Sequence, residues 1–324
     1  MCTAVSYCNG DHYFGRNLDL EYSYHETVTI TPRNHPFVFR KAGRLDKHYA
    51  MIGMAYVVGK DPLYYEATNE KGLSMAGLNF PGNADYKQET LGKDNVAPFE
   101  FIPWILGQCA SVDEAKQLLD RINLVNINYS SELPLSPLHW LISDRNTSLT
   151  VESVRDGLKI HENPVGVLTN NPPFEYQMFQ LNNYMHVSPE HPENRFCDSL
   201  PLSRYSLGMG SIGLPGGMSS TERFVKATFT KLNSVSGQTE SENISQLFHI
   251  LGSVEQQRGC TLVRENEYEI TLYSSCCNTD RGIYYYRTYE NSQITAVNMH
   301  HENLDSEEVV CYPLVLGQQI RMQN

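Results

Sequence analysis

The order of the expected elements predicts an α+β protein built on antiparallel sheets. Strand-like segments come first, and helices, strands, helices and strands follow in that order. The alternating strand–helix units that indicate a parallel sheet are missing. No Pro-, Gly- or Ser-rich linker and no block of charge divides the 324 residues. We therefore expect one domain spanning residues 1–324, because large single domains are common among sheet-rich folds.

The N-terminal segment predicts a β-hairpin that closes at Asn9-Gly10. This dipeptide is a strong signal for a tight turn between antiparallel strands. Residues 3–8 favour a strand, and the chain after the turn forms its expected partner. Such a hairpin carries Arg16 and Asp19 back toward Cys2, so that residues close in sequence become neighbours in space.

Further strands are expected in the first third of the chain, where β-branched and aromatic residues lie between turn signals. They span residues 27–31, 49–58, 64–67 and 73–78. An apolar helix is expected at residues 99–106. After it, Ser111 and Glu114 form a capping box that opens an amphipathic helix. The leucines that precede Ile122 extend this helix through Ile122.

The rest of the chain returns to strands and adds two helices. Strands are expected at residues 138–142, 149–152, 165–168, 268–273, 283–289 and 294–299, and a helix at residues 244–251. His139 lies among apolar strand residues, and we interpret it as a core histidine rather than a catalytic one. Either Ser219 or Ser220 can cap the other helix. Arg223 then lies in its first turn, where the helix dipole disfavours a cation, so we expect a specific partner for it.

Composition limits the partners of this protein. The chain has 37 acidic and 25 basic residues, with a net charge of −12. This dispersed negative charge argues against nucleic acid or an anionic membrane as a partner. No apolar run approaches the ~18 residues that span a bilayer, and no signal-peptide pattern opens the chain. We expect a cytoplasmic protein whose eight cysteines are reduced thiols. Their spacing matches no metal site.

Cys2 is the candidate nucleophile. If Met1 is removed, one residue carries both a thiol and a free α-amine, whose pKa near ~7.7–8.0 lets it act as a base. A thiol with its own general base follows the logic of N-terminal nucleophiles. Arg16 could favour the thiolate, since a nearby cation lowers a cysteine pKa, and Asp19 could hold the amine. The alternative interpretation is a buried cysteine that serves as a small hydrophobic side chain.

Six motifs spread in order along nearly the whole chain resemble the choloylglycine hydrolase family, which contains bile salt hydrolases and penicillin V acylases. They are Met-Cys-Thr at 1–3, Phe-Gly-Arg-Asn-Leu-Asp at 14–19, Asn-Glu-Lys-Gly-Leu-Ser at 69–74, Gly-Leu-Asn-Phe-Pro-Gly at 77–82, Thr-Asn-Asn-Pro-Pro-Phe at 169–174 and Gly-Leu-Pro-Gly-Gly-Met-Ser-Ser-Thr-Glu-Arg-Phe at 213–224. The resemblance implies an N-terminal nucleophile hydrolase with a four-layer αββα sandwich. It also implies homotetramers and an enzyme that uses no cofactor.

The resemblance also implies a catalytic set. Cys2 matches the nucleophile, and Arg16 and Asp19 match its two polar neighbours. Asn79 and Asn170 match the two asparagines of the oxyanion hole. Arg223 matches a further active-site arginine. Asn170 is the first residue of an asparagine doublet. Asn171 therefore stays an alternative for the second oxyanion-hole position.

Asn79 favours a bile salt hydrolase, because penicillin V acylases of the family typically have tyrosine at this position. Three loops are expected to line an apolar steroid pocket, and their candidate residues are Leu20, Tyr24, Leu63, Tyr64, Leu133 and Leu135. We therefore expect cleavage of the amide bond between a bile acid and glycine or taurine. Penicillin V or an N-acyl homoserine lactone are alternative substrates. A non-catalytic binder of amphipathic small molecules and a metal-dependent amidase are alternatives from other classes.

Overall fold

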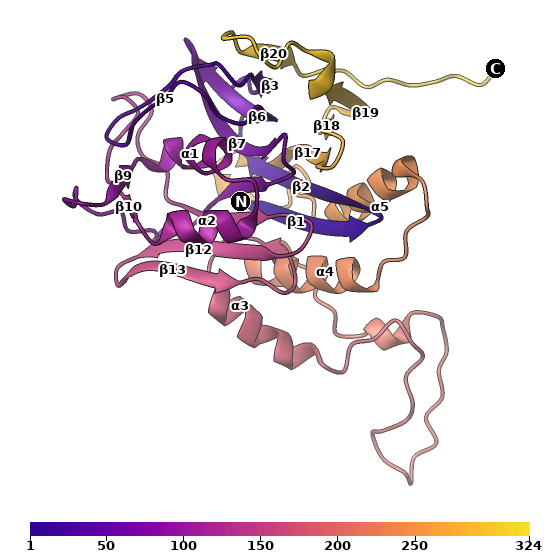
Figure 1. Cartoon of the computed structure of the whole chain (residues 1–324). Coiled ribbons are helices and arrows are strands. Elements are labelled where there is room, and N and C mark those ends of the chain that lie inside the picture. The colour runs from indigo at the N-terminus through magenta and orange to yellow at the C-terminus, as the bar shows by residue number, and fades with distance from the viewer.

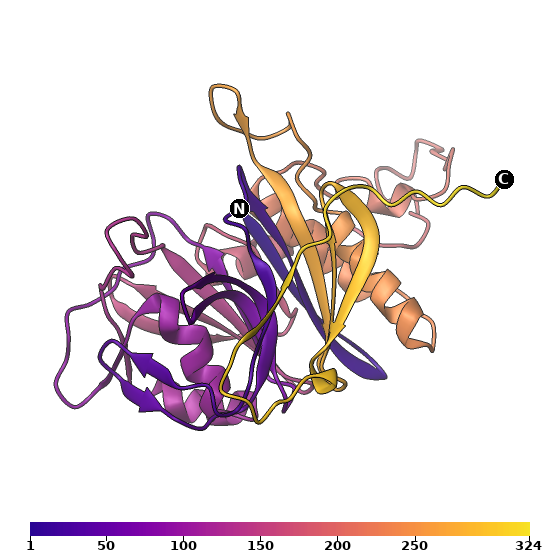
Figure 2. The same ribbon diagram turned by 90° about the horizontal axis from the view of Figure 1, so that it is seen from above.

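Two large antiparallel sheets lie face to face in the computed structural model, which describes residues 1–324. Helices cover the outer face of each sheet, as Figures 1 and 2 show. The layers are therefore helix, sheet, sheet and helix. This confirms the αββα sandwich that the family resemblance implies.

The six-stranded sheet contains the N-terminus. In spatial order its strands are β14 (Val167–Leu168), β1 (Cys2–Asn9), β2 (Asp11–Leu20), β17 (Ile270–Asn278), β18 (Ile283–Thr288) and β19 (Asn291–Asn298). Two helices, α4 (Ser220–Asn233) and α5 (Glu240–Gly252), cover its outer face (Figure 2). The first two strands thus lie inside the sheet, where neighbours on both sides fix their backbone.

The eight-stranded sheet forms the other half of the sandwich. In spatial order its strands are β13 (Gly157–Glu162), β12 (Ser148–Val154), β11 (Leu138–Ser143), β8 (Ser74–Asn79), β7 (Asp61–Asn69), β6 (Met51–Val58), β3 (Thr27–Thr31) and β20 (Val310–Pro313). Helices α1 (Phe101–Gln108) and α2 (Val112–Leu119) cover its outer face (Figure 2).

Several short elements complete the chain. Three pairs of short strands lie outside the two sheets, namely β4 (Phe37–Phe39) with β5 (Gly43–Leu45), β9 (Asp94–Val96) with β10 (Ile122–Leu124), and β15 (Leu262–Arg264) with β16 (Glu267–Tyr268). Helix α3 (Phe174–Gln180) follows β14, and single 3₁₀ turns lie at Pro98–Glu100, Leu181–Tyr184, Met209–Ser211 and Met299–His301. None of the helices combines the length and the apolar character needed to cross a bilayer.

Backbone pairing in the N-terminal hairpin places the candidate site residues. Gly10, with a φ of +69°, closes the turn between β1 and β2, and glycine adopts this left-handed conformation without a steric penalty. The register sets Arg16 opposite Ala4 and Leu18 opposite Cys2. The return strand therefore brings its polar residues to the beginning of β1, as the sequence predicts.

Helix α2 ends earlier than its spacing of apolar residues predicts. Ser111 caps it as expected, with its Oγ accepting from the backbone N–H of Glu114. The helix ends at Leu119, and Ile122 instead begins β10, where it is buried and pairs in parallel with Asp94. The prediction of a helix through Ile122 is therefore wrong, because pairing with a distant strand overrides a weak local preference.

Candidate active site

Cys2 opens β1 and is almost completely buried, with 3% of its surface exposed. Its backbone N–H donates to Asn170 Oδ1 at 2.8 Å, and its carbonyl accepts from Arg223 Nη1 at 2.6 Å. The main chain of the candidate nucleophile is thus held at both its nitrogen and its oxygen. The two side chains that hold it come from segments more than 160 residues away in sequence, separated from it by 168 and 221 positions.

Asp19 lies at the end of β2 beside the start of the chain. Its backbone N–H donates to the Met1 carbonyl at 3.0 Å, and its carbonyl accepts from the Met1 α-amine at 2.8 Å. Thr271 donates to Asp19 Oδ1 at 2.6 Å, whereas Oδ2 is buried, has no hydrogen-bond partner and lies 3.8 Å from Arg223 Nη1. Burial raises the pKa of this carboxyl against the opposing charge of Arg223. Asp19 therefore has one acceptor oxygen without a donor next to the N-terminal amine.

Arg16 brings a buried cation to the same region. Its Nη1 donates to the carbonyls of Tyr65 at 2.9 Å and Gly77 at 2.7 Å, and lies 3.7 Å from the Glu66 carboxylate. Its Nη2 is buried without a hydrogen-bond partner. Burial would lower the pKa of Arg16, but the neighbouring Cys2 and Glu66 outweigh burial and raise it. The guanidinium therefore stays charged in the neighbourhood of Cys2.

Asn170 contacts the candidate nucleophile through its side-chain oxygen. Its Oδ1 accepts from the N–H of Cys2 and from Arg223 Nη2 at 2.8 Å, and its Nδ2 donates to the Asn79 carbonyl at 2.7 Å. Both ends of the amide are therefore engaged, but one of the two N–H groups of Nδ2 makes no hydrogen bond within the chain. The neighbouring Asn171 donates to the Pro81 carbonyl at 2.7 Å and holds a loop instead.

Asn79 ends β8 and is half-buried. Its main-chain carbonyl accepts from Asn170, while its side-chain amide makes no hydrogen bond within the chain. Both asparagines predicted for an oxyanion hole thus keep a side-chain N–H without a partner in the chain, and in Asn79 the whole amide group is free.

Arg223 has the specific partners that its place in the first turn of α4 predicts. It is 1% exposed and donates to four acceptors: the carbonyls of Cys2 and Met218, Thr3 Oγ1 and Asn170 Oδ1. The cap of this helix is Ser219, whose side chain accepts from the N–H of Glu222. The arginine therefore ties the helix to the nucleophile and to the asparagine that holds it.

We expect Arg223→Ala to lower both stability and turnover. Removal of one partner from a buried charged network costs roughly 3–5 kcal/mol, because the remaining groups stay buried without a partner. Here Asp19 loses the facing positive charge, and Asn170 Oδ1 loses one of its two donors. Calorimetry would measure the fall in Tm, and active-site titration would give kcat per folded molecule. A fall in Tm with an unchanged kcat per folded molecule would make Arg223 purely structural.

The predicted pocket residues fall into two groups. Five are half-buried, namely Leu20, Tyr24, Leu63, Leu133 and Leu135. Tyr64 is instead buried in the core between the eight-stranded sheet and α1, where its hydroxyl meets Thr31 Oγ1 at 2.7 Å. The next residue, Tyr65, is half-buried and packs against the core that contains Cys2. Tyr24 lies in an aromatic cluster with Tyr22 and Tyr56, at ring-centroid distances of 5.0 and 6.1 Å.

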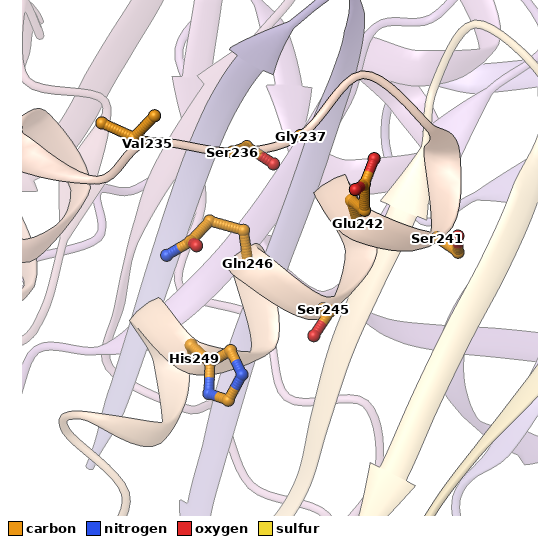
Figure 3. Close-up of a pocket in the computed structure, with 8 residues that line it drawn as sticks. All are labelled: Val235, Ser236, Gly237, Ser241, Glu242, Ser245, Gln246 and His249. Carbon is orange, nitrogen blue, oxygen red and sulfur yellow. The ribbon is translucent and has the colours of Figure 1, made fainter.

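Two hollows lie away from Cys2. One of about 380 Å³ is lined by Leu63 with Phe37, Phe99 and Tyr129 among others. The other, of about 400 Å³, lies at the start of α5 and is lined mostly by polar side chains, including those of Glu242 and Gln246 (Figure 3). Neither contains any of the six predicted catalytic residues. No three His, Cys, Asp or Glu side chains gather closely enough to hold a metal ion.

Sequence reasoning missed three polar residues that support the site. Thr271 donates to Asp19, Glu66 faces Arg16, and Ser220 Oγ accepts from the N–H of Asn170 at 2.8 Å. Each acts from a strand or helix far away in the chain. Their positions follow from strand pairing across the sheets and from the packing of α4, and no local pattern predicts them.

Known proteins resemble this chain over nearly its whole length. A family model described as linear amide C–N hydrolases, choloylglycine hydrolase family, matches residues 2–312. A bile salt hydrolase/transferase from Lactiplantibacillus plantarum is 59% identical over 97% of each chain, and one from Clostridium perfringens is 38% identical over 96% of each. The crystal structure of a mutant conjugated bile acid hydrolase from Clostridium perfringens has a TM-score of 0.92, 36% identity and full coverage of both chains. A penicillin V acylase from Agrobacterium tumefaciens shares the fold, with a TM-score of 0.77 and 19% identity. The match covers 97% of this chain and 92% of the acylase.

Proposed function

The chain belongs to the choloylglycine hydrolase family of linear amide C–N hydrolases, and on this premise we propose that it is a bile salt hydrolase. Its reaction cleaves the amide bond that joins a bile acid to glycine or taurine. The observation that carries this proposal is the Cys2 main chain held by Asn170 and Arg223, in a chain 59% identical to a named bile salt hydrolase/transferase.

We propose that Cys2 is both nucleophile and base once Met1 is removed. The nitrogen of Cys2 then becomes a free amine that donates to Asn170 Oδ1 and can take the thiol proton. Arg16 stabilises the thiolate by its buried positive charge. The thiolate sulfur attacks the amide carbon and forms a tetrahedral intermediate with a negatively charged oxygen.

The side-chain amide of Asn79 is the proposed donor to this oxyanion. A good donor of this kind contributes roughly 2.7–4 kcal/mol to the transition state. Asn170 is proposed to orient the Cys2 amine through its Oδ1 and to give its second side-chain N–H to the oxyanion. Arg223 holds Asn170 and the Cys2 carbonyl in place.

Collapse of the intermediate breaks the C–N bond. The ammonium group of Cys2 gives its proton to the leaving nitrogen, and glycine or taurine departs while the bile acid stays bound to sulfur as a thioester. The free amine then deprotonates a water molecule, which attacks the thioester and releases the bile acid. Each step uses only groups of this chain, the substrate and water.

We expect the active protein to begin at Cys2. The small side chain at position 2 permits removal of Met1, and the proposed base exists only after that removal. Intact-mass spectrometry of the purified protein would show the loss of one methionine residue. A fully active protein that retains Met1 would contradict this expectation.

A parallel assay tests the proposed function. The purified protein is incubated with glycine- and taurine-conjugated bile acids, penicillin V and an N-acyl homoserine lactone, and the released amines are quantified. We expect turnover of the bile acid conjugates to dominate. Dominant cleavage of penicillin V or the lactone would reassign the substrate. If no substrate is cleaved and iodoacetamide does not alkylate Cys2, the protein would instead be a non-catalytic binder of amphipathic molecules.

We also propose that the protein is a cytoplasmic homotetramer. Eight free cysteines suit a reducing compartment. The segment between α3 and α4 extends far from the rest of the molecule (Figure 1). Helix α3 and this segment expose nine large apolar side chains, namely Tyr176, Phe179, Met185, Phe196, Leu200, Leu202, Tyr205, Leu207 and Ile212. Exposed apolar surface of this kind is typical of an interface with another protein. Light scattering tests the assembly, and a monomeric mass would contradict it.

A further inference from the structure

His139 links the two segments that carry the site asparagines. It lies in β11, fully buried, opposite Leu78 of β8, which ends one residue later at Asn79. Its ring stacks on Phe80, the residue after Asn79, with centroids 4.2 Å apart and planes 5° from parallel. Its Nε2 lies 2.9 Å from the carbonyl oxygen of Thr169, the residue before Asn170. One imidazole thus contacts the immediate neighbours of both asparagines.

The hydrogen-bond partners of the two ring nitrogens of His139 determine which of these nitrogens carry a hydrogen. Nε2 faces a backbone carbonyl, and Nδ1 lies 3.1 Å from Glu152 Oε1. A carbonyl and a carboxylate only accept hydrogen bonds, so both ring nitrogens must donate, which requires the imidazolium form. The flat ring lies on the face of Phe80, where an aromatic face attracts a cation.

Glu152 is the negatively charged partner of His139. It is 1% exposed, and Oε1 also accepts from the N–H of Phe174 at 3.0 Å, while Oε2 lies 3.6 Å from His161 Nε2. Burial raises the pKa of this carboxyl, but the neighbouring His139 and His161 and the N–H of Phe174 outweigh burial and lower it to about 2. The acid is therefore ionised at neutral pH and balances a positive charge on His139.

We propose that His139 is a positioning residue, an imidazolium paired with Glu152 that fixes the separation between Asn79 on one sheet and Asn170 beside the other. This inference deepens the proposed function, since it assigns His139 to the hydrolysis reaction without contact with substrate. The carbonyl of Asn79 also accepts from Asn170 Nδ2, so the histidine and this bond hold the same two segments together. A ring with only one hydrogen can donate to Glu152 or to Thr169, but not to both.

Kinetics of three variants test the proposal. His139→Gln removes the ring, and Glu152→Gln keeps the shape of the acceptor but removes the charge that holds the second ring hydrogen. We expect both to lower kcat by about tenfold or more, because a displacement of ~1 Å in an active site can cost ~10²-fold. KM should change by less than about twofold, since substrate contacts remain.

His12→Gln is the matched control. His12 is an equally buried strand histidine whose nitrogens bond to Ser6 Oγ and Thr279 Oγ1 at 2.9 and 2.8 Å, near the hairpin turn and away from Cys2. We expect this variant to lose stability but to keep kcat per folded molecule. A role in stability alone would make His139→Gln behave like His12→Gln.

NMR gives a second readout that needs no substrate. In protein labelled with ¹⁵N-histidine, with the His139 signals assigned by their absence in His139→Gln, both ring nitrogens should carry hydrogen at neutral pH. Glu152→Gln should convert the ring to a neutral form with one bare nitrogen. A bare ring nitrogen in the wild-type protein would overturn the proposal.

The outcomes separate this inference from the proposed function. If the wild-type protein cleaves no amide, the proposed function and with it the positioning role fail, whatever the ring signals show. If the wild-type protein is active and Glu152→Gln, folded by circular dichroism, keeps its kcat, the positioning role alone is overturned. Should His139→Gln fail to fold, Glu152→Gln still decides.

Discussion

Replacement of Cys2 by alanine is expected to lower kcat by roughly 10⁴–10⁶, the range found when a catalytic nucleophile is removed. The substitution deletes only the sulfur. The nitrogen of residue 2 still donates to Asn170 and its carbonyl still accepts from Arg223. The fold should therefore persist, and the loss should fall on the chemical step.

Cys8→Ala provides the control, because Cys8 lies on the same strand and is exposed. Release of glycine and taurine from bile acid conjugates would be measured for both variants, together with Tm. We expect Cys8→Ala to match the wild-type protein. A Cys2→Ala variant with wild-type turnover would place the nucleophile elsewhere and remove the basis of the proposed mechanism.

The sequence predicted the part of the site that one hairpin builds. Strand alternation and the turn at Gly10 are local signals, and the register that follows from them brings Arg16 and Asp19 to Cys2. The motif around Asn170 identified a residue in contact with Cys2. The direction of its amide depends on Asn79 and Arg223, which come from other layers, so the sequence did not predict the bond from the Cys2 nitrogen to Asn170 Oδ1.

The burial of Tyr64 has a specific cause. The pairing of β6 with β7 sets Met54 opposite Glu66 and Ala55 opposite Tyr64, so that Tyr65 is an extra, bulged residue. A bulge reverses the alternation of faces along a strand. Tyr64 therefore points to the helix-covered core, while Glu66 points between the sheets to the hydroxyls of β17 and β18. Counting alternate residues cannot detect this reversal.

Other elements were not predicted because contacts with distant parts of the chain stabilise them, rather than local sequence signals. Strand β13 is largely exposed and only pairs with β12, and β20 pairs with β3, whose residues are at least 280 positions away. Helix α3 lacks a side-chain cap and begins after Pro173. His139 was correctly interpreted as a hydrogen-bonded core residue, but the charge of its partner Glu152 depends on contacts that form only in the fold.

Asn79→Ala is expected to lower kcat and kcat/KM together by roughly 10²–10³, the usual cost of losing an oxyanion donor. The side-chain amide of Asn79 makes no hydrogen bond within the chain, and the main-chain carbonyl that accepts from Asn170 survives the substitution. Stability should therefore change little. Asn83→Ala is the matched control, because Asn83 is half-buried in the following loop and its side chain also makes no hydrogen bond.

Asn79→Tyr extends the same argument to specificity. The phenol hydroxyl can still donate, but it lies farther from the main chain and adds bulk where the acyl group enters. We expect this variant to lose most bile salt hydrolysis and to shift its relative preference toward penicillin V. Steady-state kinetics on both substrates measures the shift. If Asn79→Ala raises KM alone and leaves kcat unchanged, Asn79 binds substrate or shapes the turn before Phe80, and the oxyanion donor must be sought on another residue.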